Sequence, residues 1–234
     1  MRFPIERMNS SSKGEEIADL MRFEIISGSL KPGSTVSENS IASQYQSSRS
    51  PSREAMRILQ NEGLITLKRL GAEVIGLSQK DIEELNDIRF MLERFAMIEC
   101  AKKKDNSLIA FLEFTVEKMK IAIDQKNAEE LSFLDIAFHE AIIKASEHNR
   151  IIHIWKSIEK LIITALLMAT EKRFSSDEQG YQEFLVQKHL EIVEAILEED
   201  AGLIEHHLKT HFIDTRKTVS ESVFTNNGVV KKEK

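Results

Sequence analysis

The spacing of apolar residues predicts a chain built mostly of helices. Apolar residues recur every three to four positions from Glu15 to Gly28, which predicts a first amphipathic helix. Six further helices are predicted after Leu77, at about 79–103, 107–125, 128–146, 150–173, 180–199 and 201–222. Ser78 with Asp81 has the spacing of a helix N-cap, and so has Asn127 with Glu130. We find no strand pattern beyond Leu77, so this second part of the chain is expected to be a helical bundle.

The segment from Ile41 to Gly63 reads as a helix, a tight polar turn and a second helix that begins with arginines. Ser50 is the predicted N-cap of the second helix, Pro51 its first helical residue and Gly63 its left-handed end. An apolar stripe is formed by Ala55, Met56, Ile58 and Leu59, and a second face carries Arg49, Arg53 and Arg57. Such a helix is suited to reading DNA, although a surface helix with solvated arginines has the same periodicity.

The residues from Ile65 to Leu77 predict two short strands around a turn that contains Gly71, with Lys68 and Arg69 near its tip. A helix-turn-helix followed by a basic hairpin is a winged helix. The predicted fold is therefore mainly α. It comprises an N-terminal winged helix-turn-helix with a small β-hairpin wing over residues 1–77, an antiparallel all-α bundle over 78–224, and a disordered tail over 225–234.

Composition agrees with two helical domains of ordinary size. The 234 residues include only three prolines and nine glycines, and aromatic residues make up 6%, which disfavours a sandwich or a barrel. The single cysteine, Cys100, allows no internal disulfide, and no signal peptide is visible. The longest apolar run, 161–169, is too short to span a bilayer. We therefore expect a cytoplasmic protein with no membrane partner.

The net charge of −6 is unevenly divided along the chain. Residues 1–77 hold ten Lys/Arg and nine Asp/Glu, a net of +1, so the remainder carries −7. The first part is not basic as a whole, and its affinity for DNA must come from the cluster between Arg49 and Arg69 and from dimerisation. The acidic second part is expected to stay away from DNA.

Four polar residues are predicted to point into the core of the helical bundle. Asp135 and His139 are four residues apart and share one helical face with apolar residues. His189 and His211 each lie on an apolar stripe of a later helix. Three histidines and one aspartate that converge in a bundle core would bind a divalent transition metal. Any one of these histidines taken alone is more often an ordinary core or surface residue.

Motifs of common enzymes are missing from the sequence. His139-Glu140 would begin the H-E-x-x-H motif of zinc proteases, but position 143 is Ile. A sensor needs only the metal and an anion-binding group, and Arg89 fits that role because it lies on an apolar helix stripe. The alternative is an ordinary ion pair between Arg89 and Glu93 at i,i+4.

The helix-turn-helix segment resembles the signature of the GntR superfamily of bacterial transcription regulators. The matching residues are Arg49, Pro51, Arg53, Glu54, Leu59, Glu62, Gly63 and Leu64. In the FadR branch this resemblance implies base contacts by Arg49 and Arg53, a phosphate contact by Ser50 and a wing tip near the minor groove. The predicted DNA-binding residues are Arg49, Ser50, Arg53, Arg57, Lys68, Arg69 and Gly71. The family often has an arginine where this chain has Asn39, so the operator sequence is expected to differ.

The second part of the chain resembles the FCD effector domain, through the motif from Leu134 to Ser146 and a pair of histidines 22 residues apart. The resemblance implies that Asp135, His139, His189 and His211 bind the metal, with zinc or nickel favoured, and that His206 and His207 do not. It further implies a homodimeric repressor of sugar-acid catabolism that binds pseudo-palindromic double-stranded DNA and is released by gluconate. Two alternatives stay open, a metal-dependent sugar-acid enzyme fused to a DNA-binding module, and a regulator that responds to the metal ion itself.

Overall fold

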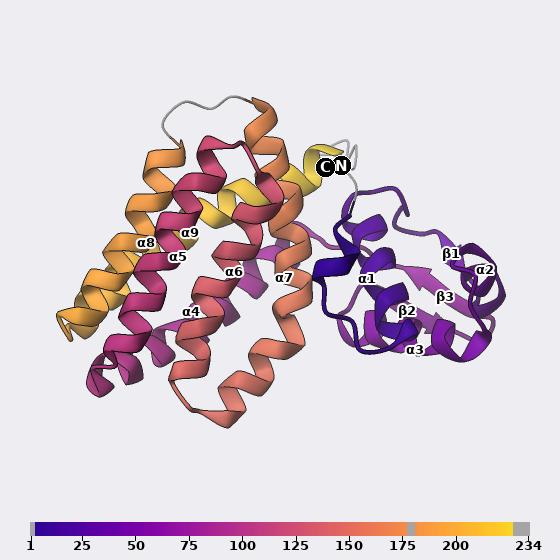
Figure 1. The fold of residues 1–234 in the computed structure, drawn as a ribbon. Helices are drawn as coiled ribbons and strands as arrows, with labels where there is room; N and C mark the ends of the chain where they lie inside the picture. The colour runs from indigo at the N-terminus through magenta and orange to yellow at the C-terminus, as the bar shows by residue number, and fades with distance from the viewer. Residues whose placement is uncertain (1–2, 177–180, 227–234) are drawn as a thin grey trace, which may run out of the picture.

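The computed structural model describes residues 3–176 and 181–226, which form a mainly α structure with one small sheet (Figure 1). The N-terminal elements are η1 (Ile5–Arg7), α1 (Lys13–Ile26), β1 (Thr35–Val36), α2 (Glu38–Gln44), α3 (Arg49–Asn61), β2 (Ile65–Lys68) and β3 (Gly71–Val74). The later helices are α4 (Gln79–Lys103), α5 (Asn106–Asp124), α6 (Ala128–Ala145), α7 (Asn149–Ser176), α8 (Tyr181–Leu197) and α9 (Ala201–Asn226). The predicted fold class, a winged helix followed by a helical bundle, is confirmed.

The start of α3 differs from the prediction. Helix α3 begins at Arg49 with Ser48 as its N-cap, and no side chain makes a capping hydrogen bond. Ser50 is therefore helical, and Pro51 is the third residue of the helix. Proline is tolerated there because the first four N–H groups of a helix have no partner within it. The other end was predicted correctly, since Gly63 follows the helix with a left-handed φ of 76°.

The sheet has three antiparallel strands in the order β1-β3-β2, and the sequence had predicted only the last two. Lys68 pairs with Gly71, so the turn of the wing is made by Arg69 and Leu70, and Gly71 opens β3 instead of lying in the turn. Gly71 has a φ of 119°, and a Cβ at this position would collide with the carbonyl oxygen of Val36. Glycine is therefore required at the point where β3 of the wing lies against the end of β1.

The bundle helices begin where the sequence placed their caps. The side chain of Ser78 accepts from the backbone N–H of Asp81 in a full capping box, and Asn127 caps α6 in a similar way. Helix α9 continues to Asn226, two residues into the predicted tail, and residues 227–234 lie outside the described residues. Among the helices that the structure describes, none is long and apolar enough to cross a lipid bilayer.

The winged helix packs directly against the bundle through α1 and α7 (Figure 1). Leu161 and Ala165 of α7 belong to the same buried apolar cluster as Ile17 and Met21 of α1. The apolar core of the winged helix is thus continuous with the bundle surface that supports it.

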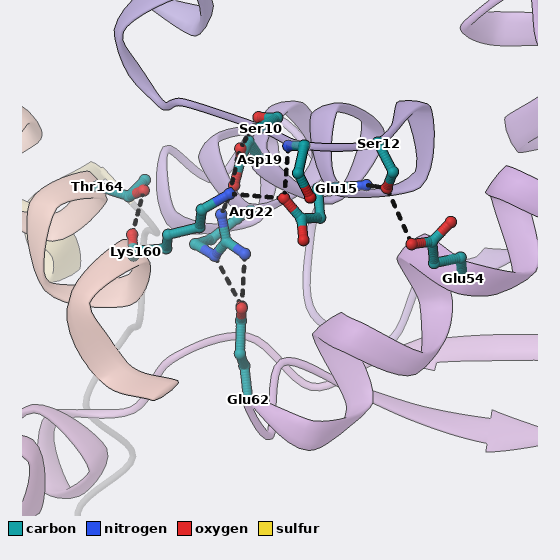
Figure 2. Close-up of polar contacts among 10 residues, drawn as sticks. Ser10, Ser12, Glu15, Asp19, Arg22, Glu54, Glu62, Lys160 and Thr164 are labelled. Atoms are coloured by element: carbon teal, nitrogen blue, oxygen red, sulfur yellow. Dashed lines mark hydrogen bonds and ion pairs between the residues drawn. The ribbon is translucent and has the colours of Figure 1, made fainter. Parts of the chain in front are cut away.

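A chain of charged residues crosses the same boundary (Figure 2). Lys160 of α7 lies 3.0 Å from a carboxylate oxygen of Asp19 on α1, and Arg22 contacts the other oxygen of Asp19. Arg22 also donates two hydrogen bonds, of 2.7 and 2.5 Å, to the carboxylate of Glu62. Asp19 and Arg22 are fully buried. Because Glu62 is the C-cap residue directly after α3, this chain links the bundle to the end of the predicted recognition helix.

Candidate metal centre and DNA-binding surface

Asp135, His139, His189 and His211 converge in the core of the bundle. Asp135 and His139 come from α6, His189 from α8 and His211 from α9, and all four side chains are buried. One ligand atom from each residue lies within 4.8 Å of the others. Four ligands at about 2.1 Å from a tetrahedral ion lie about 3.4 Å from one another, so the most distant pair would have to close by about 1.4 Å for all four to share an ion. The structure thus brings together the four residues that the sequence singled out.

The histidine rings are turned so that one nitrogen of each faces the shared space. Nδ1 of His189 donates to the carbonyl oxygen of Leu185 at 2.9 Å, which leaves Nε2 pointing to Asp135 Oδ1 at 3.2 Å. In the neutral ring this Nε2 is an acceptor, and so is the carboxylate oxygen. Two acceptors would repel each other at this distance, so a proton or a metal ion between them would make the contact favourable. Nε2 of His139 and of His189 are buried without a hydrogen-bond partner. Unpartnered buried nitrogens and a carboxylate are the donor set that zinc or nickel takes.

The charges of the cluster suit a metal ion. Burial alone would raise the pKa of Asp135, but the close approach of His189 Nε2 and the charges of the neighbouring histidines lower it below its usual range, so the carboxylate is ionised. Burial, and then the charges of His139 and His189, lower the pKa of His211 well below its usual range. A neutral imidazole and an ionised carboxylate are the forms that bind metals.

Glu93 of α4 joins this cluster, and the sequence had not indicated it as a partner of His139. Its Oε2 lies 2.6 Å from Nδ1 of His139, which leaves the ring's Nε2 for the shared space. Carboxylates behind metal-binding histidines commonly fix the ring orientation in this way. The available signal was that Glu93 follows Arg89 by one turn on the same inward-facing stripe.

Arg89 is buried in the core of the bundle, and its predicted alternative partner is present. Its Nε donates to Glu93 Oε1 at 2.9 Å, so the i,i+4 ion pair exists. The guanidinium carbon lies 4.8 Å from the ring centre of Phe212 and 5.8 Å from that of Trp155. Nη2 of Arg89 and Nε1 of Trp155 are both buried without a hydrogen-bond partner. Two unused donors therefore remain within the core, which is expensive unless a ligand accepts from them.

The remaining histidines lie away from the cluster. His148, His153 and His206 are exposed, and His207 is 3.1 Å from Glu191 on the surface of the bundle.

The predicted DNA-binding residues gather on one face of the winged helix. Helix α3 and the wing enclose a groove of 440 Å³. The residues on its walls include Arg49, Arg53, Arg57, Lys68, Arg69, Leu70 and Gly71. Ser50 is exposed at the start of α3 but does not line this groove. The arrangement gathers five cations on a domain whose overall charge is close to neutral.

Arg53 is held by a second residue that the sequence had not indicated. Glu38, the first residue of α2, receives hydrogen bonds from Nε and Nη2 of Arg53 at 2.7 and 2.9 Å. The hydrogen bonds from Arg53 lower the pKa of Glu38, so its carboxylate is ionised. A bidentate contact fixes the plane of the guanidinium before any ligand arrives.

Two family models match the chain. Residues 13–74 match the model described as bacterial regulatory proteins, gntR family, and residues 84–214 match the FCD domain. The gluconate operon transcriptional repressors of Bacillus subtilis and Bacillus licheniformis are 34% and 33% identical to the chain. Each of these alignments covers 94% of this chain and 90% of the relative.

A solved structure shares the fold. The structure described as E. coli McbR/YncC matches with a TM-score of 0.67 over 91% of this chain and 99% of its own. Its sequence identity of 17% limits the likeness to the fold. Both families, and the Bacillus relatives, are transcription regulators and not enzymes, which removes the enzyme alternative.

Proposed function

Because the chain belongs to the gntR family of bacterial regulatory proteins and carries an FCD domain, we propose that it represses an operon for sugar-acid catabolism and leaves its operator when a sugar acid binds in the bundle. The observation that carries this proposal is the cluster of Asp135, His139, His189 and His211 beside the unused donor of Arg89. Gluconate is the favoured effector because the relatives from Bacillus are named as gluconate operon repressors. The protein would act as a homodimer on a pseudo-palindromic operator.

Each part of the bundle site has a role in this proposal. The three histidines and Asp135 would hold a zinc or nickel ion, and Glu93 would orient His139. A bound divalent ion would supply an anchor for a carboxylate and its neighbouring hydroxyl. Nη2 of Arg89 and Nε1 of Trp155 would donate to the remaining oxygens of the ligand. These donors suit a polyhydroxylated anion better than an apolar acid.

We expect gluconate to release the protein from its operator. The release can be only as large as the preference of gluconate for the DNA-free state, roughly 5- to 150-fold in affinity. Operator binding should be titrated with gluconate, galactonate, glucuronate and citrate, with and without a chelator. By reciprocity, operator DNA should weaken gluconate binding by the same factor.

The outcomes of this titration separate the competing hypotheses. A response to another acid but not to gluconate would contradict the assignment of gluconate as effector, and the proposed binding site in the bundle would still stand. Repression that follows metal concentration and ignores every acid would favour a metal-responsive regulator.

The charged chain at the domain boundary offers a route from the effector to DNA. Trp155, which contacts Arg89, and Lys160 lie on the same helix, α7, little more than one turn apart. Lys160 contacts Asp19, and Arg22 connects Asp19 to Glu62 at the end of α3. A displacement of α7 by a ligand would therefore shift the partners of the recognition helix. Rigid elements joined by buried ion pairs transmit such shifts because a packed core does not deform gradually.

Replacing Lys160 by Met should uncouple the effector from DNA. The substitution removes the cation that reaches Asp19 while Arg22 and Ser10 still bind this carboxylate. We expect gluconate and metal to bind as before, and the ratio of operator affinities without and with gluconate to fall toward one. Lys156→Met, which removes an exposed lysine one turn earlier on α7, is the matched control. An unchanged ratio in Lys160→Met would exclude this route.

A further inference from the structure

The tip of the wing carries an exposed leucine that the fold does not explain. Leu70 is 90% exposed, more than any other large apolar side chain in the part of the chain that the structure describes. Two-residue hairpin turns favour Gly, Asn and Asp, which are polar or small. Here the turn consists of Arg69 and Leu70, and neither has a positive φ. Neither turn chemistry nor core packing therefore calls for leucine at this position.

The wing holds Leu70 at a fixed place beside the cationic groove. Strand β3 pairs with both β1 and β2, and Gly71 packs against the backbone of Val36, so the tip is anchored on two sides. Leu70 lines the same groove as Arg49 and Arg53 of α3. Lys68 and Arg69 precede it directly, so the apolar side chain stands among groups that bind phosphates.

We propose that Leu70 is a wedge that enters the minor groove of the operator and partly unstacks one base step. This inference rests on the docking of α3 in the major groove, which is part of the proposed function. Leucine is among the side chains that proteins insert between base steps from the minor groove, and such insertion kinks the duplex toward the major groove. The surrounding cations match the charge of DNA, which favours DNA over a protein as the partner of this tip. Flexible steps such as TA or CA would be preferred beneath the tip, so Leu70 would add sequence preference without a hydrogen bond to a base.

The test compares Leu70→Asn with Leu70→Phe on an operator that the unmodified protein selects from random duplexes. Asparagine is a common turn residue and should not impair folding, but it removes the apolar wedge. We expect Leu70→Asn to lose about tenfold or more in operator affinity, from the lost burial of a leucine side chain. The DNA bend, measured by energy transfer between labelled ends, should be smaller than with the unmodified protein. A 2-aminopurine base at the contacted step should become brighter when the unmodified protein unstacks it, and Leu70→Asn should not cause this increase. Leu70→Phe should keep both the bend and the fluorescence.

Two controls separate a wedge from a phosphate contact and from general loss of apolar surface. Affinity falls as salt rises, and Lys68→Ala should make the slope of log affinity against log salt shallower by about 0.9. Leu70→Asn should leave that slope unchanged. Ile75→Ala removes a 48% exposed apolar side chain from the same domain and should change neither affinity nor bend.

Three results would overturn the wedge. One is equal affinity and bend in Leu70→Asn and the unmodified protein. Another is reduced affinity with an unchanged bend and unchanged fluorescence. The third is a change in oligomeric state with unchanged DNA binding, which would assign Leu70 to a protein contact. In each case an intact response to gluconate would leave the proposed function standing.

Discussion

The double substitution Arg49→Ala with Arg53→Ala is expected to abolish specific operator binding. A bidentate contact between arginine and guanine discriminates against a wrong base by roughly 5- to 150-fold. With two such contacts in each half-site of a dimer, the loss should be on the order of 10³-fold or more, which leaves only non-specific affinity. Each single substitution should relax preference at its own base position. Both affinity and sequence preference should be measured in gel shifts at one fixed salt concentration.

A matched control for this experiment is Arg94→Ala. Arg94 is also a surface arginine paired with a carboxylate, 2.9 Å from Glu205, but it lies on the bundle. We expect no change in operator affinity for Arg94→Ala. The unmodified protein, the double variant and Arg94→Ala should have similar thermal stability, because the replaced side chains are partly or fully exposed. If the double variant kept full specificity, α3 could not be the recognition helix.

Replacing His139 or His189 by Ala should remove the metal and the response to gluconate together. Purified protein should carry about one divalent ion per chain by elemental analysis, and each variant should carry none. An ion that binds only the folded state adds roughly 2.7 kcal/mol of stability at a hundredfold excess over its Kd. The chelator should therefore lower the melting temperature of the unmodified protein but not that of the variants. His153→Ala, at an exposed position on α7, is the control that should behave as unmodified protein.

The chelator comparison also distinguishes a metal site from a purely structural cluster. Loss of packing would lower the melting temperature of a variant without changing its response to chelator. Protein that is free of metal and cannot be reconstituted with zinc or nickel would contradict the site. In that case protons on the histidine rings, and not a metal ion, would have to balance the charge of the Asp135 carboxylate.

Periodicity within single helices predicted much of this molecule. The inward stripes that carry His189 and His211 are local patterns, and so is the face that carries Arg49, Arg53 and Arg57, which is why the sequence located them. Glu93 against His139, and Glu38 against Arg53, are contacts between different helices, and no local pattern specifies them. The error at Ser50 has another cause. Proline fits any of the first helical positions, so Pro51 marks the start of a helix only to within a turn.

The buried Arg22 also limits how this regulator can recombine with its relatives. A winged helix grafted from another protein would replace Asp19, Arg22 and Glu62 together, and Lys160 of the bundle would then face an unrelated side chain in place of Asp19. Under the route proposed above, an exchange that retains control of DNA binding by the bundle would have to transfer α1 and the end of α3 together with a lysine at position 160. The heritable unit of regulation is then this set of residues from both domains, and a crossover in the linker between Leu77 and Gln79 would divide it.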